Sequence, residues 1–284
     1  MKYGIHTPND ESTVADWVEL YVAVNDEPAS RDMISSAVED SSMSEPTEEF
    51  ISGVVDVLRT RQTLYGKNAP YEVRDSVIYS TLSWTGYPEY MACLIFALEG
   101  NPNSDVLSSA EAGKLFERLC IDPVENYFGG SALLYGFPTT VELNDVVRRT
   151  LGERFIYDPP STRKDRNLDM VVWKPFEDDR SCQLVALIQC AAGSNWKLKL
   201  KELNLEAWCK YVHWAARPIK GFTIPAIIEN EDDMHEHGTD AGIIFDRARL
   251  YRHGYGPGRP VKDVTIRTDL LDWCTARLSE MQCI

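Results

Sequence analysis

The sequence predicts an α/β protein in which helices flank a central mixed sheet, preceded by a mainly helical region. Residues 1–110 place apolar side chains three and four positions apart, as amphipathic helices do. After residue 107 the pattern changes, and apolar runs of strand length alternate with helical segments. The four runs lie at 168–176, 183–192, 220–228 and 241–251. They are mostly apolar on both faces, which is typical of strands covered by helices on each side.

Three segments of the first region show helical periodicity. They are residues 13–24, 47–66 and 71–100. Thr47 is a suitable N-cap for the second helix, because a threonine hydroxyl can accept from the free backbone N–H groups of a first turn. The polar, acidic residues 27–49 that lead into this helix are expected to form a flexible connection.

Turn residues and charge divide the chain into two predicted domains. The segment EGNPNSD at 99–105 is rich in turn formers, so we predict one domain at 1–106 and a second at 107–284. Residues 1–110 contain 18 Asp or Glu and 6 Lys or Arg, and the rest of the chain contains 26 and 23. The first domain therefore carries most of the net charge of −15 and is expected to dock a partner or regulate the second.

The second domain is expected to build helices around its strands. They cover residues 108–129, 139–155, 195–214 and 269–281, and the run 129–138 adds a short strand. Ser108 or Ser109 would cap the first helix. A polar loop joins the strand at 168–176 to the strand at 183–192, so these two are expected to form a hairpin.

Composition excludes several classes of protein. No run of about 18 apolar residues occurs, which argues against a membrane helix, and the first residues lack the pattern of a secretory signal. The seven cysteines form no CxxC pair and no zinc spacing, so they are expected to be reduced thiols of a cytoplasmic protein. The chain contains no Walker motif, no dinucleotide-binding glycine pattern and no GxSxG motif.

Two polar residues at the ends of the predicted hairpin could bind a hard cation. Asp169 begins the first strand and Gln189 lies near the end of the second, so their side chains are expected to meet at one edge of the sheet. Oxygen ligands bind a divalent cation, which polarises a phosphate ester and lowers the pKa of a bound water. A lysine nearby would stabilise the negative charge that develops there.

This arrangement resembles the PD-(D/E)XK nuclease superfamily, and within it the Mrr-type and defence-associated restriction endonucleases. In that superfamily an Asp lies on the first strand of a hairpin, and Glu or Gln, any residue and Lys follow on the second. The segment KDRNLDMVVW supplies Asp165 and Asp169, and LVALIQCAA supplies Gln189. The segment KLFERLC supplies Glu117, which matches the acid of a preceding helix. The resemblance covers residues 107–255 and implies a restriction-endonuclease-like core.

One position departs from the family pattern. Residue 191, two beyond Gln189, is alanine instead of lysine. Some members of the superfamily carry this lysine on the adjacent helix, where the present chain has Lys197 and Lys199. Side chains two positions apart on a helix diverge by about 200°, so only one of the two is expected to face the site. Lys199 is preferred, and Lys197 remains an alternative.

The resemblance implies a DNA endonuclease that hydrolyses phosphodiester bonds with Mg²⁺ or Mn²⁺ in bacterial anti-phage defence. Asp169, Glu117 and Gln189 would hold the metal, and Gln in place of an acid would weaken its binding. The acidic first domain would dock an ATPase or helicase, and homodimers are common in the superfamily. The alternative is a catalytically degenerate adaptor that keeps the fold and binds DNA or a partner in a defence complex.

Further residues are candidates for contacts with DNA. If residues 241–251 form a strand, Arg247 and Arg249 share one face and could grip a DNA backbone. Lys201 and Asn195, beside the candidate catalytic lysines, complete the predicted set of DNA contacts.

Other acids and histidines receive weaker predictions. Glu142 and Glu153 are lesser candidates for the helix acid. The segment 232–240 contains His235 and His237 among carboxylates, and we expect it to be a solvated loop.

Overall fold

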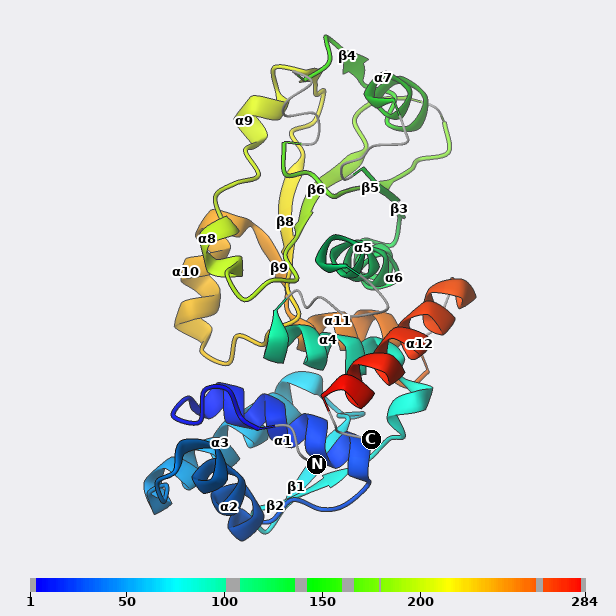
Figure 1. Cartoon of the computed structure of the whole chain (residues 1–284). Helices are drawn as coiled ribbons and strands as arrows, with labels where there is room; N and C mark the ends of the chain where they lie inside the picture. The colour runs from blue at the N-terminus through cyan, green and yellow to red at the C-terminus, as the bar shows by residue number, and fades with distance from the viewer. Residues whose placement is uncertain are drawn as a thin grey trace.

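A computed structural model describes residues 4–100, 108–135, 142–159, 166–178, 180–258 and 263–281. A five-stranded sheet with its helices lies above a second group of helices formed largely by the N-terminal residues (Figure 1). The predicted class, an α/β protein with a mixed sheet flanked by helices, is therefore confirmed. Among the residues described, no helix is long and apolar enough to cross a membrane.

The central sheet combines antiparallel and parallel strands. In spatial order its strands are β3 (Ser131–Leu134), β5 (Met170–Lys174), β6 (Leu184–Cys190), β8 (Ile219–Thr223) and β9 (Ile243–Phe245). Strand β5 is antiparallel to both of its neighbours, β3 and β6, whereas β6, β8 and β9 run parallel. The predicted hairpin is β5–β6, with Met170 opposite Ile188 and Lys174 opposite Leu184.

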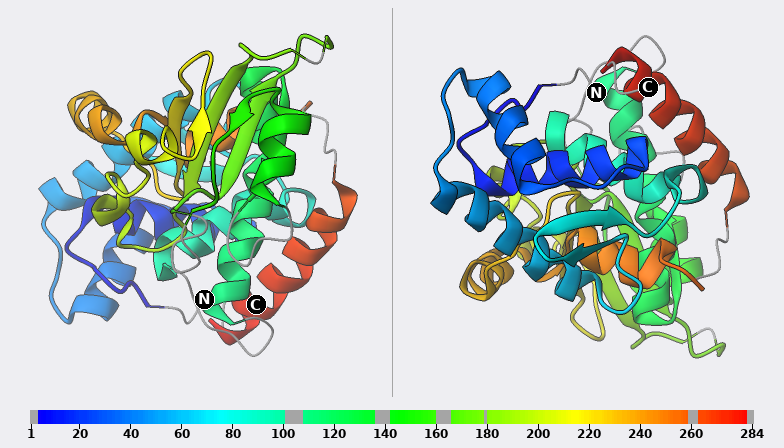
Figure 2. Two further views of the ribbon diagram at one scale, coloured as in Figure 1. Left: turned by 90° about the horizontal axis from the view of Figure 1, so that it is seen from above. Right: turned by 90° about the horizontal axis from the view of Figure 1, so that it is seen from below.

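Helices cover both faces of this sheet (Figure 2). On one face lie α5 (Ser109–Leu119) and α6 (Ile121–Phe128), which share a hydrophobic core with β5 and β6. On the other face, α8 (Trp196–Lys199) and α10 (Glu231–Ala241) pack against β8 and β9.

A smaller cluster closes the far end of the sheet. Its elements are α7 (Leu143–Asp145), the π-helical turn η2 (Val146–Thr150), α9 (Leu205–Trp208) and the strand pair β4 (Arg154–Phe155) and β7 (Val212–His213). The single helix expected at 195–214 is therefore wrong. It is divided into α8 and α9, and Asn204 caps α9 by accepting from the backbone N–H of Ala207.

The N-terminal residues form four longer helices, one short helix and a hairpin. They are α1 (Glu11–Asn25), α2 (Arg31–Ser42), α3 (Glu48–Tyr65), β1 (Tyr71–Arg74), β2 (Val77–Ser80), the short helix η1 (Trp84–Gly86) and α4 (Pro88–Glu99). The flexible connection expected at 27–49 is wrong, because α2 occupies most of it. Ser30 caps α2, and the side chains of Ile34 and Val38 are buried.

The predicted helix at 71–100 is also wrong in its first third, which forms the β1–β2 hairpin. Asp75 and Ser76 have φ values of 48° and 63°. A two-residue turn with both central residues at positive φ matches the twist of antiparallel strands. The spacing of apolar residues in this segment suits a helix or a strand, and the turn at Asp75 and Ser76 decides in favour of the hairpin.

Two further expectations, for the segments 232–240 and 241–251, are wrong. The segment 232–240 is not a loop but most of α10, whose N-cap Asn230 accepts from two backbone N–H groups. The strand expected over 241–251 ends at Phe245, because Asp246 caps a new helix, α11 (Arg247–Leu250). A π-helical turn, η4 (Tyr251–Tyr255), and the long α12 (Val264–Glu280) follow.

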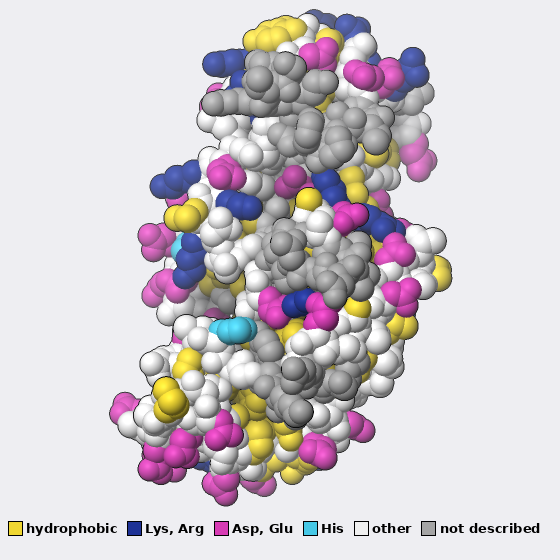
Figure 3. Space-filling view, viewed as in Figure 1, with side chains coloured by type: hydrophobic (Ala, Val, Ile, Leu, Met, Phe, Trp, Pro, Cys, Tyr) yellow, Lys and Arg dark blue, Asp and Glu magenta, His cyan; other side chains and the backbone are white. Residues whose placement is uncertain are grey.

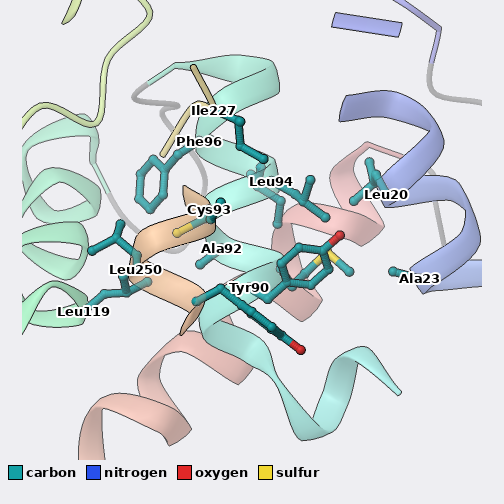
Figure 4. Close-up of a cluster of buried hydrophobic side chains, with 14 of the residues drawn as sticks. Leu20, Ala23, Tyr90, Ala92, Cys93, Leu94, Phe96, Leu119, Ile227 and Leu250 are labelled. Atoms are coloured by element: carbon teal, nitrogen blue, oxygen red, sulfur yellow. The ribbon is translucent and has the colours of Figure 1, made fainter. Parts of the chain in front are cut away.

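A single buried core joins the N-terminal helices to the sheet. Its members run from Ile5 through the N-terminal helices to Met170, Ile188 and Met281. Helix α4 lies at its centre, and Figure 4 shows its side chains facing those of α1, α5 and α11. The core is thus continuous across position 106, where two domains were predicted to divide; residues 101–107 lie outside the described ranges.

A buried network of charges also crosses this junction. Arg61 donates to the carboxylates of Asp16 and Glu19 at 2.8 and 2.9 Å, and Arg247 donates to the same Asp16 at 2.5 Å. Arg247 Nε lies 2.8 Å from the hydroxyl of Tyr65. Both arginines are at most 1% exposed. We refer to Asp16, Glu19, Arg61 and Arg247 as the buried charge network.

The buried charge network makes stability dependent on pH. Burial alone would raise the pKa of Asp16, but the charges of Arg247 and Arg61 outweigh it and hold that pKa below its ordinary value of 3.8. Asp16 therefore stabilises the fold above pH 3.8, and this contribution is lost as the pH falls through the lower folded value. We expect the urea midpoint to fall between about pH 5 and about pH 2, and to fall less in Arg247→Met. An equal fall in both proteins would contradict this role of Asp16.

Candidate functional site

The β5–β6 hairpin brings Asp169 to the end of β6. Asp169 immediately precedes β5, and its backbone N–H donates to the carbonyl of Ile188 at 3.0 Å. Its carbonyl accepts from the N–H of Tyr135, the residue after β3, at 2.7 Å. Its carboxylate Oδ2 accepts from the N–H of Cys190 at 2.7 Å. The carboxylate is therefore fixed beside the last two residues of β6, of which Gln189 is one.

Gln189 contributes a buried amide at this point. The residue is 4% exposed, and its Nε2 donates to Oε2 of Glu202 at 2.9 Å. Its Oε1 is buried and has no hydrogen-bond partner among the described residues. A buried acceptor without a donor costs about 1–3 kcal/mol. An oxygen in this state is one that a bound cation would satisfy.

Glu202 is a site residue that the sequence analysis missed. It is exposed, follows α8 by three positions, and orients the amide of Gln189 through the bond described above. Its backbone carbonyl accepts from Asn167 at 3.3 Å, which ties it to the turn before β5. In the sequence Glu202 comes just after Lys197, Lys199 and Lys201. A glutamate beside several lysines is expected to balance surface charge, so nothing in the sequence distinguished it from the other glutamates.

Helix α5 brings Glu117 toward the same strand end. The pKa of the Cys190 thiol lies well above its ordinary value, first because of a hydrogen bond with Cys120 and burial, and then because of nearby negative charge. That charge includes the carboxylates of Asp169 and Glu117, so both lie close to Cys190. The carboxylate of Glu117 also forms an ion pair with Lys114 at 3.0 Å.

These residues offer oxygen donors of the kind that Mg²⁺ and Mn²⁺ bind. Within the described ranges, no group of three or more His, Cys, Asp or Glu side chains is arranged to hold a metal ion. A site made by Asp169, Glu117 and the amide of Gln189 contains only two such side chains. The buried amide oxygen of Gln189, which accepts from no donor among the described residues, supports a metal site made of these two carboxylates and one amide. Asp165, the other predicted aspartate, lies outside the described residues.

The two candidate lysines have different surroundings on α8. Lys197 is exposed, and its ammonium lies 5.6 Å from the centroid of the Trp196 ring. Lys199 is half-buried. Position 191, where the family pattern has lysine, is a fully buried alanine. A lysine there would enter the core cluster of Trp196 and Phe222, so the strand itself has no room for a charged side chain.

The predicted DNA contacts are not brought together. Arg247 is buried in the charge network, so its proposed contact with a DNA backbone is wrong. Arg249 is exposed on α11, Lys201 forms an ion pair with Asp240 at 3.3 Å, and Asn195 is exposed before α8. The strand that was expected to align the two arginines ends before either of them.

The lesser candidates lie in other surroundings. Glu153 is buried and accepts from the backbone N–H groups of Cys182 and Ala215, so it holds loops together. Glu142 is exposed before α7. His235 and His237 lie on α10, and the ring of His237 packs edge-on against Trp196 at 5.3 Å.

Comparison with known proteins gives no relative: no protein-family model, no curated protein and no solved structure matches the chain. The interpretation of the site therefore depends on its own geometry.

Proposed function

We propose that the chain is a metal-dependent endonuclease with a restriction-endonuclease-like core, which hydrolyses phosphodiester bonds in DNA. The observation that supports this most is the meeting of Asp169 and the end of β6, where the amide oxygen of Gln189 is buried and has no partner among the described residues. An acid and an amide at the open ends of two paired strands are suitable ligands for a cation that polarises a phosphate ester.

Each residue of the site has a proposed role. Asp169, Gln189 and Glu117 would hold Mg²⁺ or Mn²⁺, which when bound supplies positive charge to the phosphate and lowers the pKa of a water. The backbone N–H of Cys190 orients the carboxylate of Asp169, and Glu202 orients the amide of Gln189. These bonds preorganise the oxygen donors, so little reorganisation is needed during the reaction.

Lys199 is proposed to stabilise negative charge on the scissile phosphate. Lys199→Ala should reduce nicking of supercoiled plasmid in Mg²⁺ by about a hundred-fold, the magnitude typical of losing one preorganised donor. Lys197→Ala is the matched control, because Lys197 is exposed, lies against Trp196 and belongs to the same short helix. The loss of activity in Lys197→Ala, with full activity in Lys199→Ala, would reverse the assignment.

The basic test is plasmid nicking by the full chain with Mg²⁺, Mn²⁺ or EDTA. Nicking that requires the metal supports the proposal. Uncut plasmid under all conditions, from protein that retains its circular dichroism spectrum, contradicts an independently active enzyme.

The second candidate function is an adaptor that keeps this fold without catalysis. The observation that favours it is the use of the Asp169 carboxylate to satisfy the Cys190 N–H, which is a purely structural task. An adaptor would bind duplex DNA equally well with and without Mg²⁺. Metal-dependent cleavage excludes this candidate.

A protein partner such as an ATPase or helicase, a homodimer, and a setting in bacterial anti-phage defence remain proposals from the resemblance. The acidic surface suits a basic partner. Asp and Glu gather over the lower end of the molecule (Figure 3). The exposed acids of α2, α3 and the segment between them are Asp32, Glu39, Asp40, Glu45, Glu48, Glu49 and Asp56. Replacing them with Asn and Gln should weaken capture of such a partner without affecting the core.

A further inference from the structure

Glu202 has a carboxylate oxygen that its hydrogen bond to Gln189 leaves unused. Oε2 of Glu202 accepts from Nε2 of Gln189 at 2.9 Å. Among the described residues, no hydrogen bond reaches its Oε1, and no Lys, Arg or His lies at ion-pair distance from the carboxylate. An ionised carboxylate can accept through both oxygens, so Oε1 can take a further ligand while Oε2 stays bonded to the amide.

The lysines next to Glu202 in the sequence do not neutralise its charge. The ammonium of Lys201 pairs with Asp240 at 3.3 Å, and the ammonium of Lys197 lies 5.6 Å from the centroid of the Trp196 ring. Within the described ranges, the negative charge of Glu202 is therefore not balanced by an ion pair.

Glu202 is fixed in position although it lies at the surface. Its backbone N–H donates to the carbonyl of Lys199 at 3.0 Å, and its own carbonyl accepts from Asn167 at 3.3 Å. The next residue, Leu203, is 1% exposed and belongs to the core cluster of Trp208. Both backbone groups and the side chain are thus held, and a metal ligand has to be preorganised in this way.

The same bonds place Glu202 beside Asp169. Asn167, which binds the backbone of Glu202, precedes Asp169 by two positions. Gln189 binds the carboxylate of Glu202, and the next residue, Cys190, donates its backbone N–H to Oδ2 of Asp169 at 2.7 Å. The two carboxylates are therefore bonded to consecutive residues at the end of β6.

The chemistry of this strand end favours a further carboxylate ligand. The buried Oε1 of Gln189 accepts from no described donor, but a neutral amide oxygen attracts a divalent cation less strongly than a carboxylate does. Mg²⁺ and Mn²⁺ bind through several oxygens, and carboxylates supply the negative charge. Glu117 already pairs with Lys114 at 3.0 Å, whereas Glu202 has no cationic partner in the described part of the chain.

We infer that Glu202 is a further metal ligand, which binds a divalent cation through Oε1 while its Oε2 holds the amide of Gln189. The residue then has a role beyond orienting that amide, because it supplies negative charge to a site in which one donor is neutral. This inference rests on the metal site of the proposed function.

The variant Glu202→Gln separates the ligand role from the orienting role. The amide oxygen of the new glutamine can still accept from Nε2 of Gln189, so the orienting bond is retained. The other oxygen is replaced by an NH₂ group, which only donates hydrogen bonds and does not bind a cation. Glu206→Gln is the matched control, because Glu206 is an exposed glutamate on α9 that pairs with Arg217.

The test is calorimetric titration of the full chain with MnCl₂ in the absence of DNA. We expect Glu202→Gln to weaken Mn²⁺ binding by about tenfold or more, since even the loss of an outer-shell partner costs about 10–100-fold in metal affinity. Glu206→Gln should bind as wild type does, and Asp169→Asn should lose binding. Circular dichroism of each variant shows whether it is folded.

Eu³⁺, a hard cation that binds to oxygen ligands, is the second probe. Its luminescence lifetime in H₂O and in D₂O reports how many waters the bound ion carries. Glu202→Gln should add water to the ion, because solvent fills the position that Oε1 leaves. A residue that only orients Gln189 would leave the hydration of the ion unchanged.

The outcomes distinguish this inference from the proposed function. If folded Glu202→Gln binds Mn²⁺ with wild-type affinity, or carries Eu³⁺ with wild-type hydration, Glu202 is not a ligand, although a loss of binding in Asp169→Asn would still support the metal site. Wild-type protein that does not bind Mn²⁺ contradicts both. Binding that depends on Glu202, in a protein that does not nick plasmid, supports the inference and contradicts the endonuclease.

Discussion

Asp169→Asn is expected to abolish metal-dependent nicking while leaving the fold intact. The substitution removes the negative charge that would hold Mg²⁺, and a bound metal contributes several kcal/mol to stabilising charge on a phosphate. Since each 1.36 kcal/mol corresponds to tenfold in rate, we expect a loss of about a hundred-fold or more. The amide oxygen of Asn can still accept from the N–H of Cys190, so the bond that orders the strand end is retained.

The measurement is the initial rate of plasmid nicking at saturating Mg²⁺, repeated with Mn²⁺. Asp178→Asn is the matched control, because Asp178 lies in the loop of the same hairpin and pairs with Arg180 at the surface. Cleavage by Asp169→Asn at the wild-type rate would remove the central residue of the proposed site. A contaminating nuclease would give the same rate in every variant and would be recognised in that way.

Arg247→Met is expected to lower the free energy of unfolding by about 3–5 kcal/mol, the cost of breaking a buried ion pair on one side. Arg247 is fully buried, and its guanidinium contacts Asp16, Glu19 and the hydroxyl of Tyr65. Methionine fills part of the volume but donates no hydrogen bond. Asp16 and Glu19 would then have only Arg61, which also pairs with Glu229, so negative charge would exceed positive charge in this buried space.

Urea unfolding followed by tryptophan fluorescence measures this loss. Arg249→Met, two residues along the same helix, is exposed and should lower the free energy of unfolding by no more than about 1 kcal/mol. If Arg247→Met is too unstable to purify, Arg247→Lys keeps the charge without the planar fork and should give an intermediate loss. Equal stability of Arg247→Met and wild type would show that the buried charge network does not stabilise the fold.

The hairpin that carries the candidate site was predictable because its signals are local. Strands β5 and β6 are short apolar runs joined by a polar loop, and that pattern fixes a hairpin wherever the rest of the chain lies. The position of Asp169 at the start of one strand and Gln189 near the end of the other then follows from strand geometry. The anchor provided by Glu202 does not follow, because it depends on how the chain returns after α8.

The assignment of Arg247 to a DNA surface failed for a related reason. An arginine next to an apolar run is usually a surface residue, and alternate spacing suggested a strand face. Asp246 instead ends β9 and caps α11, which turns Arg247 inward. Its partners Asp16 and Glu19 lie 231 and 228 positions earlier in the chain. Neither helix propensity nor strand spacing carries information about a pairing at that separation.

The buried charge network also has a consequence for synthesis of the chain on the ribosome. Arg61 follows Asp16 by 45 residues and can pair with it soon after emerging, but Arg247 emerges 231 residues later. At about 5–20 residues per second, the carboxylates of α1 wait roughly 10 to 50 s for their second cation. During that interval Asp16 has only one of the two arginines that pair with it in the finished fold. The buried charge network is therefore completed only after the last strand of the sheet, β9, has been made.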